Sequence, residues 1–167
     1  MIIIIFGVSG AGKTTVGKLL ACERGCPFIE ADDFHPAANI EKMRNGLPLT
    51  DEDRWPWLDC LRKQIEQLLS TEENAVLACS ALKRAYRDRL RVSGEVKFVF
   101  LRGDYALVEK QLRSRHRHFM NANLLQSQFD DLEQPQPDEN VLTIELGRPP
   151  EEIVERIKSK LNLAGSR

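Results

Sequence analysis

Five short apolar runs recur along the chain, and polar segments of very different length separate them. The runs are Ile2–Phe6, Phe28–Ala31, Val76–Cys79, Val96–Leu101 and Val141–Leu146. Apolar runs of this length without polar alternation are typical of strands that are buried on both faces of a parallel sheet. We therefore predict one strand for each run.

Helical periodicity fills the segments between these runs. Apolar residues recur at helical spacing in 14–24, 57–69, 107–112 and 153–161. Thr50–Asp53 resembles a helix N-terminus, and Pro56 leaves open a delayed start of regular helix at Trp55 or beyond. Alternating strands and helices predict an α/β fold of three layers, α/β/α, around a five-stranded parallel sheet. Ligands of such folds bind beyond the carboxyl ends of the strands.

Length and charge narrow the picture further. The 167 residues suit one domain, 1–167, and a net charge of −1 gives no general attraction to nucleic acid or membranes. Residues 83–117 nevertheless hold eleven Lys/Arg against four Asp/Glu. This basic stretch suits a polyphosphate ligand, or else it is a solvated face. Four scattered cysteines and the lack of a signal or membrane-spanning segment predict a cytoplasmic protein.

The segment from Gly7 to Thr14 matches the pattern G-x-x-x-x-G-K-[ST] between a predicted strand and a predicted helix. Glycines allow a tight turn whose N–H groups converge on an anion, and the helix start adds more donors. Lys13 is expected to reach the β- and γ-phosphates of a nucleotide, and the Thr14 hydroxyl to ligate Mg²⁺. A ligand-free glycine turn is the alternative, but it does not require the Lys-Thr pair. The predicted nucleotide-binding residues are Gly7, Val8, Ser9, Gly10, Ala11, Gly12, Lys13, Thr14 and Thr15.

The segment Glu30–Pro36, at the end of the second predicted strand, is rich in carboxylates. Facing the phosphates across a cleft, one of Asp32 and Asp33 can accept a proton from a substrate hydroxyl or hold Mg²⁺ through water. The alternative is structural: Asp33 caps a turn and Asp32 is a solvated loop residue.

Cations occur at three further places. Arg54 follows three acids and either pairs with them or binds an anionic group. Lys83 and Arg87, one helical turn apart, form either a surface pair or a pair that binds a carboxylate or phosphate. Arg113–Met120 is the densest cluster, and we interpret it as part of a lid, approximately residues 113–125, that closes over ATP. A helix C-terminus with cations matched to its dipole is the alternative.

Together these segments resemble the small gluconokinases. The resemblance covers nearly the whole chain in order and is carried by Gly7–Thr15, Ala31–Pro36, Asn39, Lys42–Met43, Gly46–Arg54, Pro56–Leu58, Cys79–Lys83, Tyr86–Asp88, His118–Phe119, Leu125, Gln128–Phe129 and Leu132–Glu133. It implies the P-loop fold of the nucleoside-monophosphate-kinase group, with strand order 2-3-1-4-5 and a lid. It also implies phosphorylation of D-gluconate at the 6-hydroxyl with ATP and Mg²⁺, and a homodimer.

The resemblance also implies roles for individual residues. Asp32 would be the base or orienter of the substrate hydroxyl; His35, Arg54 and Lys83 would lie near the gluconate. Arg115 and His118 would belong to the lid, with Arg115 and Lys13 acting on the transferring phosphoryl group. The chain departs from the family at Arg117, where a small residue, often Gly, is usual.

The sequence thus predicts a sugar-acid kinase with Lys13, Asp32 and Arg115 as catalytic residues. Its partners would be ATP and D-gluconate, without nucleic acid or membrane. Another small-molecule kinase, of the shikimate or nucleoside type, is the alternative within the same class. A nucleotide-dependent regulatory switch is a more distant one, and the chain lacks a guanine-reading N-K-x-D sequence.

Overall fold

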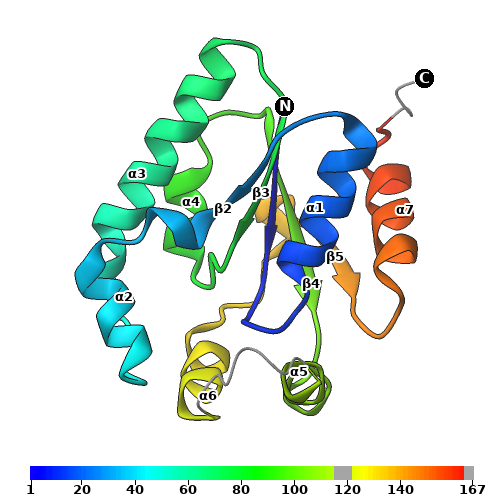
Figure 1. Ribbon diagram of the computed structural model, residues 1–167. Coiled ribbons are helices and arrows are strands. Elements are labelled where there is room, and N and C mark those ends of the chain that lie inside the picture. Colours follow the sequence, from blue (N-terminus) through cyan, green and yellow to red (C-terminus); the bar gives the residue numbers. More distant parts are fainter. Residues whose placement is uncertain (115–121, 164–167) are drawn as a thin grey trace.

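The computed structural model describes residues 1–114 and 122–163 and contains a parallel five-stranded sheet (Figure 1). The strands are β1 (Ile2–Phe6), β2 (Phe28–Glu30), β3 (Ala75–Cys79), β4 (Val96–Arg102) and β5 (Leu142–Glu145). Their order is β2-β3-β1-β4-β5, and all pairings are parallel. The predicted fold class and strand order are confirmed.

The central strand β1 is buried on both faces. Its five residues are at most 1 % exposed, and they alternate between two hydrophobic clusters. Ile2, Ile4 and Phe6 belong to one cluster, and Ile3 and Ile5 to the other. An unbroken apolar run is therefore what this position in the sheet requires.

Helices cover both faces of the sheet (Figure 1). On one face lie α1 (Lys13–Arg24) and α7 (Pro150–Lys160), and on the other lie α3 (Asp51–Ser70) and α4 (Arg84–Leu90). Near the carboxyl ends of the strands lie α2 (Ala37–Arg44), α5 (Tyr105–Arg113) and α6 (Ala122–Asp131). Two short 3₁₀ helices, η1 (Ala31–Phe34) and η2 (Pro137–Glu139), complete the described elements.

Regular helix in α3 begins at Asp51, so the delay considered for Pro56 does not occur. The Thr50 hydroxyl accepts a hydrogen bond from the Asp53 N–H at 3.2 Å, and the Asp53 carboxylate accepts one from the Thr50 N–H at 2.9 Å. This reciprocal cap stabilises the first turn. Pro56 is accommodated inside the helix, where it fixes its own φ but removes one backbone donor.

The described part of the basic stretch, residues 83–114, has most of its cations paired within the fold. Six of its cations pair with carboxylates, most of them from distant segments: Lys83–Asp51, Arg84–Asp138, Arg87–Glu139, Arg89–Asp59, Arg102–Glu145 and Arg113–Glu109. The local excess of positive charge in the sequence is therefore not an excess on the described surface. Among the helices of residues 1–114 and 122–163, none is long and apolar enough to cross a membrane.

Candidate active site

The loop between β1 and α1 has the backbone that its glycines predict. Gly10 and Gly12 adopt φ of +82° and +88°, in the left-handed region that other residues rarely occupy. A Cβ on Gly10 would also lie 2.5 Å from Cγ of Leu112, so the position has no room for a side chain. Lys13 folds back over the loop, and its Nζ donates to the Val8 carbonyl at 2.9 Å. Val8 and Ala11 anchor the loop in the core, whereas Thr15 is exposed.

Thr14 lies beside a carboxylate that the sequence analysis gave no role. Its hydroxyl donates to Glu30 Oε2 at 2.7 Å. Burial raises the pKa of Glu30, and the hydrogen bond from Thr14 offsets part of that effect. A hydroxyl and a carboxylate are the oxygen ligands that Mg²⁺ accepts, with phosphate oxygens and water completing its shell, so these residues fit the ion. No group of three or more His, Cys, Asp or Glu in the described ranges could hold a metal unaided.

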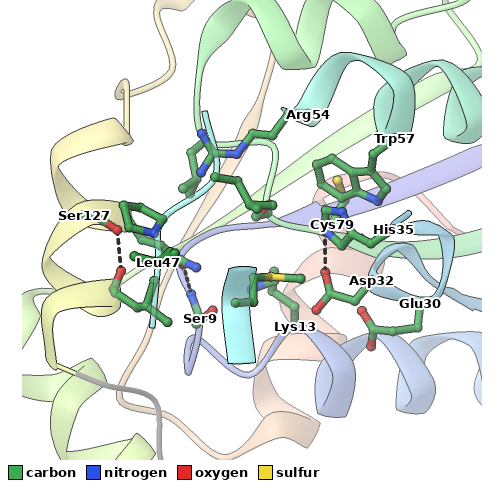
Figure 2. Close-up of a pocket in the computed structure, with 17 residues that line it drawn as sticks. Ser9, Lys13, Glu30, Asp32, His35, Leu47, Arg54, Trp57, Cys79 and Ser127 are labelled. Atoms are coloured by element: carbon green, nitrogen blue, oxygen red, sulfur yellow. Dashed lines mark hydrogen bonds and ion pairs between the residues drawn. The ribbon is translucent and has the colours of Figure 1, made fainter. Parts of the chain in front are cut away.

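A cavity of about 420 Å³ opens beside this loop (Figure 2). It lies at the carboxyl ends of β1, β2 and β3, as predicted for a sheet of this kind. The residues that line it are Ser9, Lys13, Glu30, Asp32, His35, Met43, Leu47, Pro48, Leu49, Arg54, Trp57, Cys79, Ser80, Leu82, Leu124, Ser127 and Gln128. The predicted residues Lys13, Asp32, His35 and Arg54 are thus brought together, whereas Lys83 does not line the cavity.

His35 has neighbours on one ring face and at both ring nitrogens. Its ring stacks on Trp57 with centroids 4.2 Å apart, and its Nε2 lies 3.7 Å from Asp32 Oδ1 (Figure 2). The buried Asn39 amide nitrogen faces His35 Nδ1 at 3.3 Å and donates to the Asp53 carbonyl at 2.8 Å. Because that nitrogen can only donate, Nδ1 is the acceptor and the ring proton sits on Nε2, toward Asp32. Burial lowers the pKa of His35, which favours this neutral form.

Asp32 lies at the mouth of the cavity, with 70 % of its side chain exposed. The short helix η1 that carries it is held by Trp57, whose Nε1 donates to the Ala31 carbonyl at 2.7 Å. Trp57 is 1 % exposed. An exposed carboxylate on a fixed backbone can accept a proton from a hydroxyl that enters the cavity.

Arg54 belongs to a polar network that also contains Lys83. Its guanidinium donates to Tyr86 Oη at 3.0 Å and to Asp131 Oδ2 at 2.9 Å. Lys83 Nζ donates to Asp51 Oδ1 at 2.9 Å, and Tyr86 Oη donates to the same carboxylate. These contacts raise the pKa of Lys83, chiefly through the Asp51 hydrogen bond. The network links Arg54, at the wall of the cavity, to Lys83 through Tyr86 and Asp51.

The prediction for Arg87 is wrong. It forms neither a surface pair with Lys83 nor a ligand-binding pair with it. Its side chain is fully buried and binds Glu139, with Nε to Oε2 at 2.6 Å and Nη2 to Oε1 at 2.9 Å. Its Nη1 donates to the Leu82 carbonyl at 2.9 Å. The residue therefore turns away from the ligand side and ties the loop after β3 to η2. Helical spacing alone could not reveal a carboxylate partner 52 residues away.

Helix α6 closes the cavity on the side opposite β2 with Leu124, Ser127 and Gln128. The Ser9 N–H, in the phosphate loop, donates to Gln128 Oε1 at 2.6 Å. Of the predicted lid, Arg113 ends α5 and pairs with Glu109, whereas Arg115, Arg117 and His118 fall outside the described residues. Their predicted roles stay predictions.

A second, smaller cavity of about 190 Å³ lies on the other side of the phosphate loop. Ala11, Gly12 and Thr15 line it from the loop and the start of α1. Gln111, Ser114 and Arg148 line it from α5 and from the segment before α7. The phosphate loop therefore separates two cavities. Carboxylates and cations line the larger one, and Gly12 of the loop lines the smaller one.

Several cavity residues were missed by the sequence analysis, namely Glu30 as partner of Thr14, Ser80, Ser127 and Gln128. Glu30 had a usable signal, since it ends a strand next to the phosphate loop. Trp57 was not singled out for the site either. For Gln128 only the resemblance to the family marked the segment.

Comparisons with known proteins agree with this geometry. Residues 2–135 match the AAA domain family. The thermosensitive gluconokinase of Escherichia coli is 47 % identical, in an alignment that covers 81 % of this chain and 73 % of the relative. A crystal structure of a sugar kinase from a Janibacter species superposes with a TM-score of 0.92 at 43 % identity, covering 98 % of this chain and 95 % of the other.

A crystal structure of a gluconokinase from Sinorhizobium meliloti gives a TM-score of 0.84 at 41 % identity, covering 96 % of this chain and 94 % of the other. The sequence resemblance is therefore confirmed, and the chain belongs to the gluconokinase family.

Proposed function

We propose that this chain transfers the γ-phosphoryl group of ATP to the 6-hydroxyl of D-gluconate. The observation that carries the proposal is the cavity beside the phosphate loop, in which Lys13, Asp32, His35 and Arg54 converge. Membership of the gluconokinase family supports the choice of gluconate over shikimate or a nucleoside.

The two cavities suggest how the substrates divide between them. The triphosphate lies along the loop, the nucleoside occupies the space beside Gly12, Thr15 and Arg148, and gluconate occupies the larger cavity. The attacking hydroxyl then meets the γ-phosphoryl at Ser9 and Lys13. This arrangement puts donor and acceptor in line across the loop, so positioning supplies much of the catalysis.

Each residue then has a chemical task. Asp32 accepts the proton of the 6-hydroxyl, and His35 directs its Nε2 proton at Asp32 and so orients the carboxylate. Lys13 leaves the Val8 carbonyl for the phosphates and spreads the charge of the transferring group. Arg54 supplies positive charge for the carboxylate end of gluconate.

Mg²⁺ would be held by Thr14, with Glu30 beside it directly or through water. In that place the ion would supply positive charge that offsets the charge of the phosphate oxygens. We also propose that the chain is cytoplasmic, as its scattered cysteines suggest, and that it forms a homodimer, as its family resemblance implies. Sedimentation at several concentrations tests the dimer.

The activity is tested by ADP release in a coupled assay with gluconate, glucose, shikimate and nucleosides as acceptors. D-Gluconate should be the best acceptor, and glucose should be poor although it has the same 6-hydroxyl, because glucose lacks the carboxylate that the positive charge of Arg54 favours in the site. Comparable kcat/KM values for glucose and gluconate would overturn the sugar-acid assignment. Slow ATP hydrolysis that no acceptor accelerates would favour the regulatory switch.

A further inference from the structure

Gln128 joins the phosphate loop to the acceptor cavity through one side chain. Its Oε1 accepts the Ser9 N–H at 2.6 Å, and the residue also lines the cavity of about 420 Å³. A backbone N–H can only donate, so the orientation of the carboxamide is determined: its oxygen faces the loop and its nitrogen faces away from it. In residues 1–114 and 122–163 the Gln128 nitrogen has no hydrogen-bond acceptor.

The helix that carries Gln128 is fixed on two sides. Leu125 is 2 % exposed in the core, and the Phe129 ring lies 5.4 Å from the ring of Tyr105 on α5. Beyond the helix end, the Glu133 N–H donates to the Leu82 carbonyl at 3.0 Å, and the Arg84 N–H donates to Glu133 Oε2 at 2.7 Å. The Gln128 side chain is therefore held in place before any ligand arrives.

We propose that Gln128 is a specificity-determining residue that donates a hydrogen bond from Nε2 to the 5-hydroxyl of the acceptor. This proposal rests on the function proposed above. The 6-hydroxyl must reach the γ-phosphoryl at the phosphate loop, and Gln128 is bonded to that same loop. The hydroxyl within its reach is therefore the one next to the reacting carbon and far from the carboxylate.

The chemistry of the cavity favours this assignment. When ionised, the carboxylates of Glu30 and Asp32 can only accept hydrogen bonds from a substrate hydroxyl. Lys13 and Arg54 can only donate hydrogen bonds, and each carries a positive charge. A carboxamide donates without charge, so it recognises a hydroxyl without attracting a competing anion. The attacking hydroxyl itself gives its proton to Asp32, which leaves the neighbouring hydroxyl as the partner of Gln128.

The test compares D-gluconate with its 5-deoxy and 2-deoxy analogues in the wild type and in Gln128→Met. The wild type should use the 5-deoxy analogue about tenfold less efficiently than gluconate, as kcat/KM. Gln128→Met should use gluconate and the 5-deoxy analogue with equal kcat/KM. The ratio of kcat/KM for the 2-deoxy analogue to that for gluconate should stay the same in this variant as in the wild type. Gln126→Met is the matched control, because Gln126 lies on the same helix, is exposed, and donates to the exposed Asp130 instead of the phosphate loop.

Several outcomes would overturn the proposal. One is a Gln128→Met variant that still uses the 5-deoxy analogue about tenfold less efficiently than gluconate, with kcat/KM lowered by the same factor for every acceptor. A purely structural role of Gln128 would give this result. Another is a rise in the KM for ATP alone. If the melting temperature of Gln128→Met is well below that of the wild type, Gln128→Ala allows the same comparison of acceptors. A wild type that does not phosphorylate gluconate at all would instead refute the proposed function, before any variant is compared.

Discussion

The phosphate loop and the acceptor cavity lie side by side but are built in opposite ways. The loop comes from one continuous segment, Gly7–Thr15, whose glycines and following helix create its geometry locally. The cavity is assembled from segments as far apart as Ser9 and Gln128. Phosphate chemistry is therefore encoded locally, whereas the choice of acceptor depends on tertiary packing.

This difference predicts distinct consequences of mutation. A change in the loop should stop phosphoryl transfer and leave acceptor binding and stability intact. A change in the contacts that assemble the cavity should alter stability or acceptor affinity and leave ATP binding intact.

Lys13→Ala should have the largest effect and tests the loop alone. Loss of its charge from the transferring phosphoryl group should lower kcat by about 10³-fold or more. Circular dichroism and the melting temperature should stay unchanged. Lys18→Ala, at an exposed position of α1, is the control and should keep normal turnover. Near-normal kcat in Lys13→Ala would remove the phosphate site from the proposed function.

Arg87→Met should break the assembly of the cavity wall. It leaves the buried Glu139 carboxylate without its partner, and we expect a loss of about 3–5 kcal/mol in the free energy of unfolding. Arg89→Met is the matched control, because its ion pair with Asp59 is partly exposed and should contribute less than about 1 kcal/mol. Denaturation in urea measures both. Equal losses for the two variants would contradict the special role of the buried pair.

Asp32→Asn should separate chemistry from binding within the cavity. The change keeps the side-chain volume but removes the proton acceptor, so kcat should fall by about 10²-fold. The dissociation constant for ATP should stay within a few-fold of the wild-type value. Asp33→Asn serves as control, since Asp33 is exposed and does not line the cavity. If Asp33→Asn is the slower enzyme, the base is Asp33.

Trp57→Phe should have the smallest effect and sharpen the comparison further. It keeps an aromatic ring beside His35 but removes the hydrogen bond to the Ala31 carbonyl, at a cost of about 1 kcal/mol in stability. Because η1 carries Asp32, the KM for gluconate should rise a few-fold while the KM for ATP stays constant. An equal rise in both would show that the two regions are not separable.

The sequence predicted the sheet almost completely, because five apolar runs and the helices between them are local signals. It also predicted the phosphate loop and the meeting of Asp32, His35 and Arg54. It did not predict that Arg87 is buried against Glu139, or that Gln128 reaches Ser9. Such pairs join segments whose spacing along the chain carries no periodicity, so only the folded topology reveals them.

The burial of β1 at the centre of the sheet has a consequence for synthesis of the chain. Ile2–Phe6 is translated before its partners on either side, which begin only at Ala75 and Val96. Until both have emerged, an uncharged stretch of four isoleucines and a phenylalanine has no strand to pair with, and such stretches favour intermolecular β-association. Expression at high rates should therefore benefit from chaperones that bind short apolar segments. Once residues beyond β4 have been translated, β1 can pair with both neighbouring strands, and these chaperones should no longer be needed.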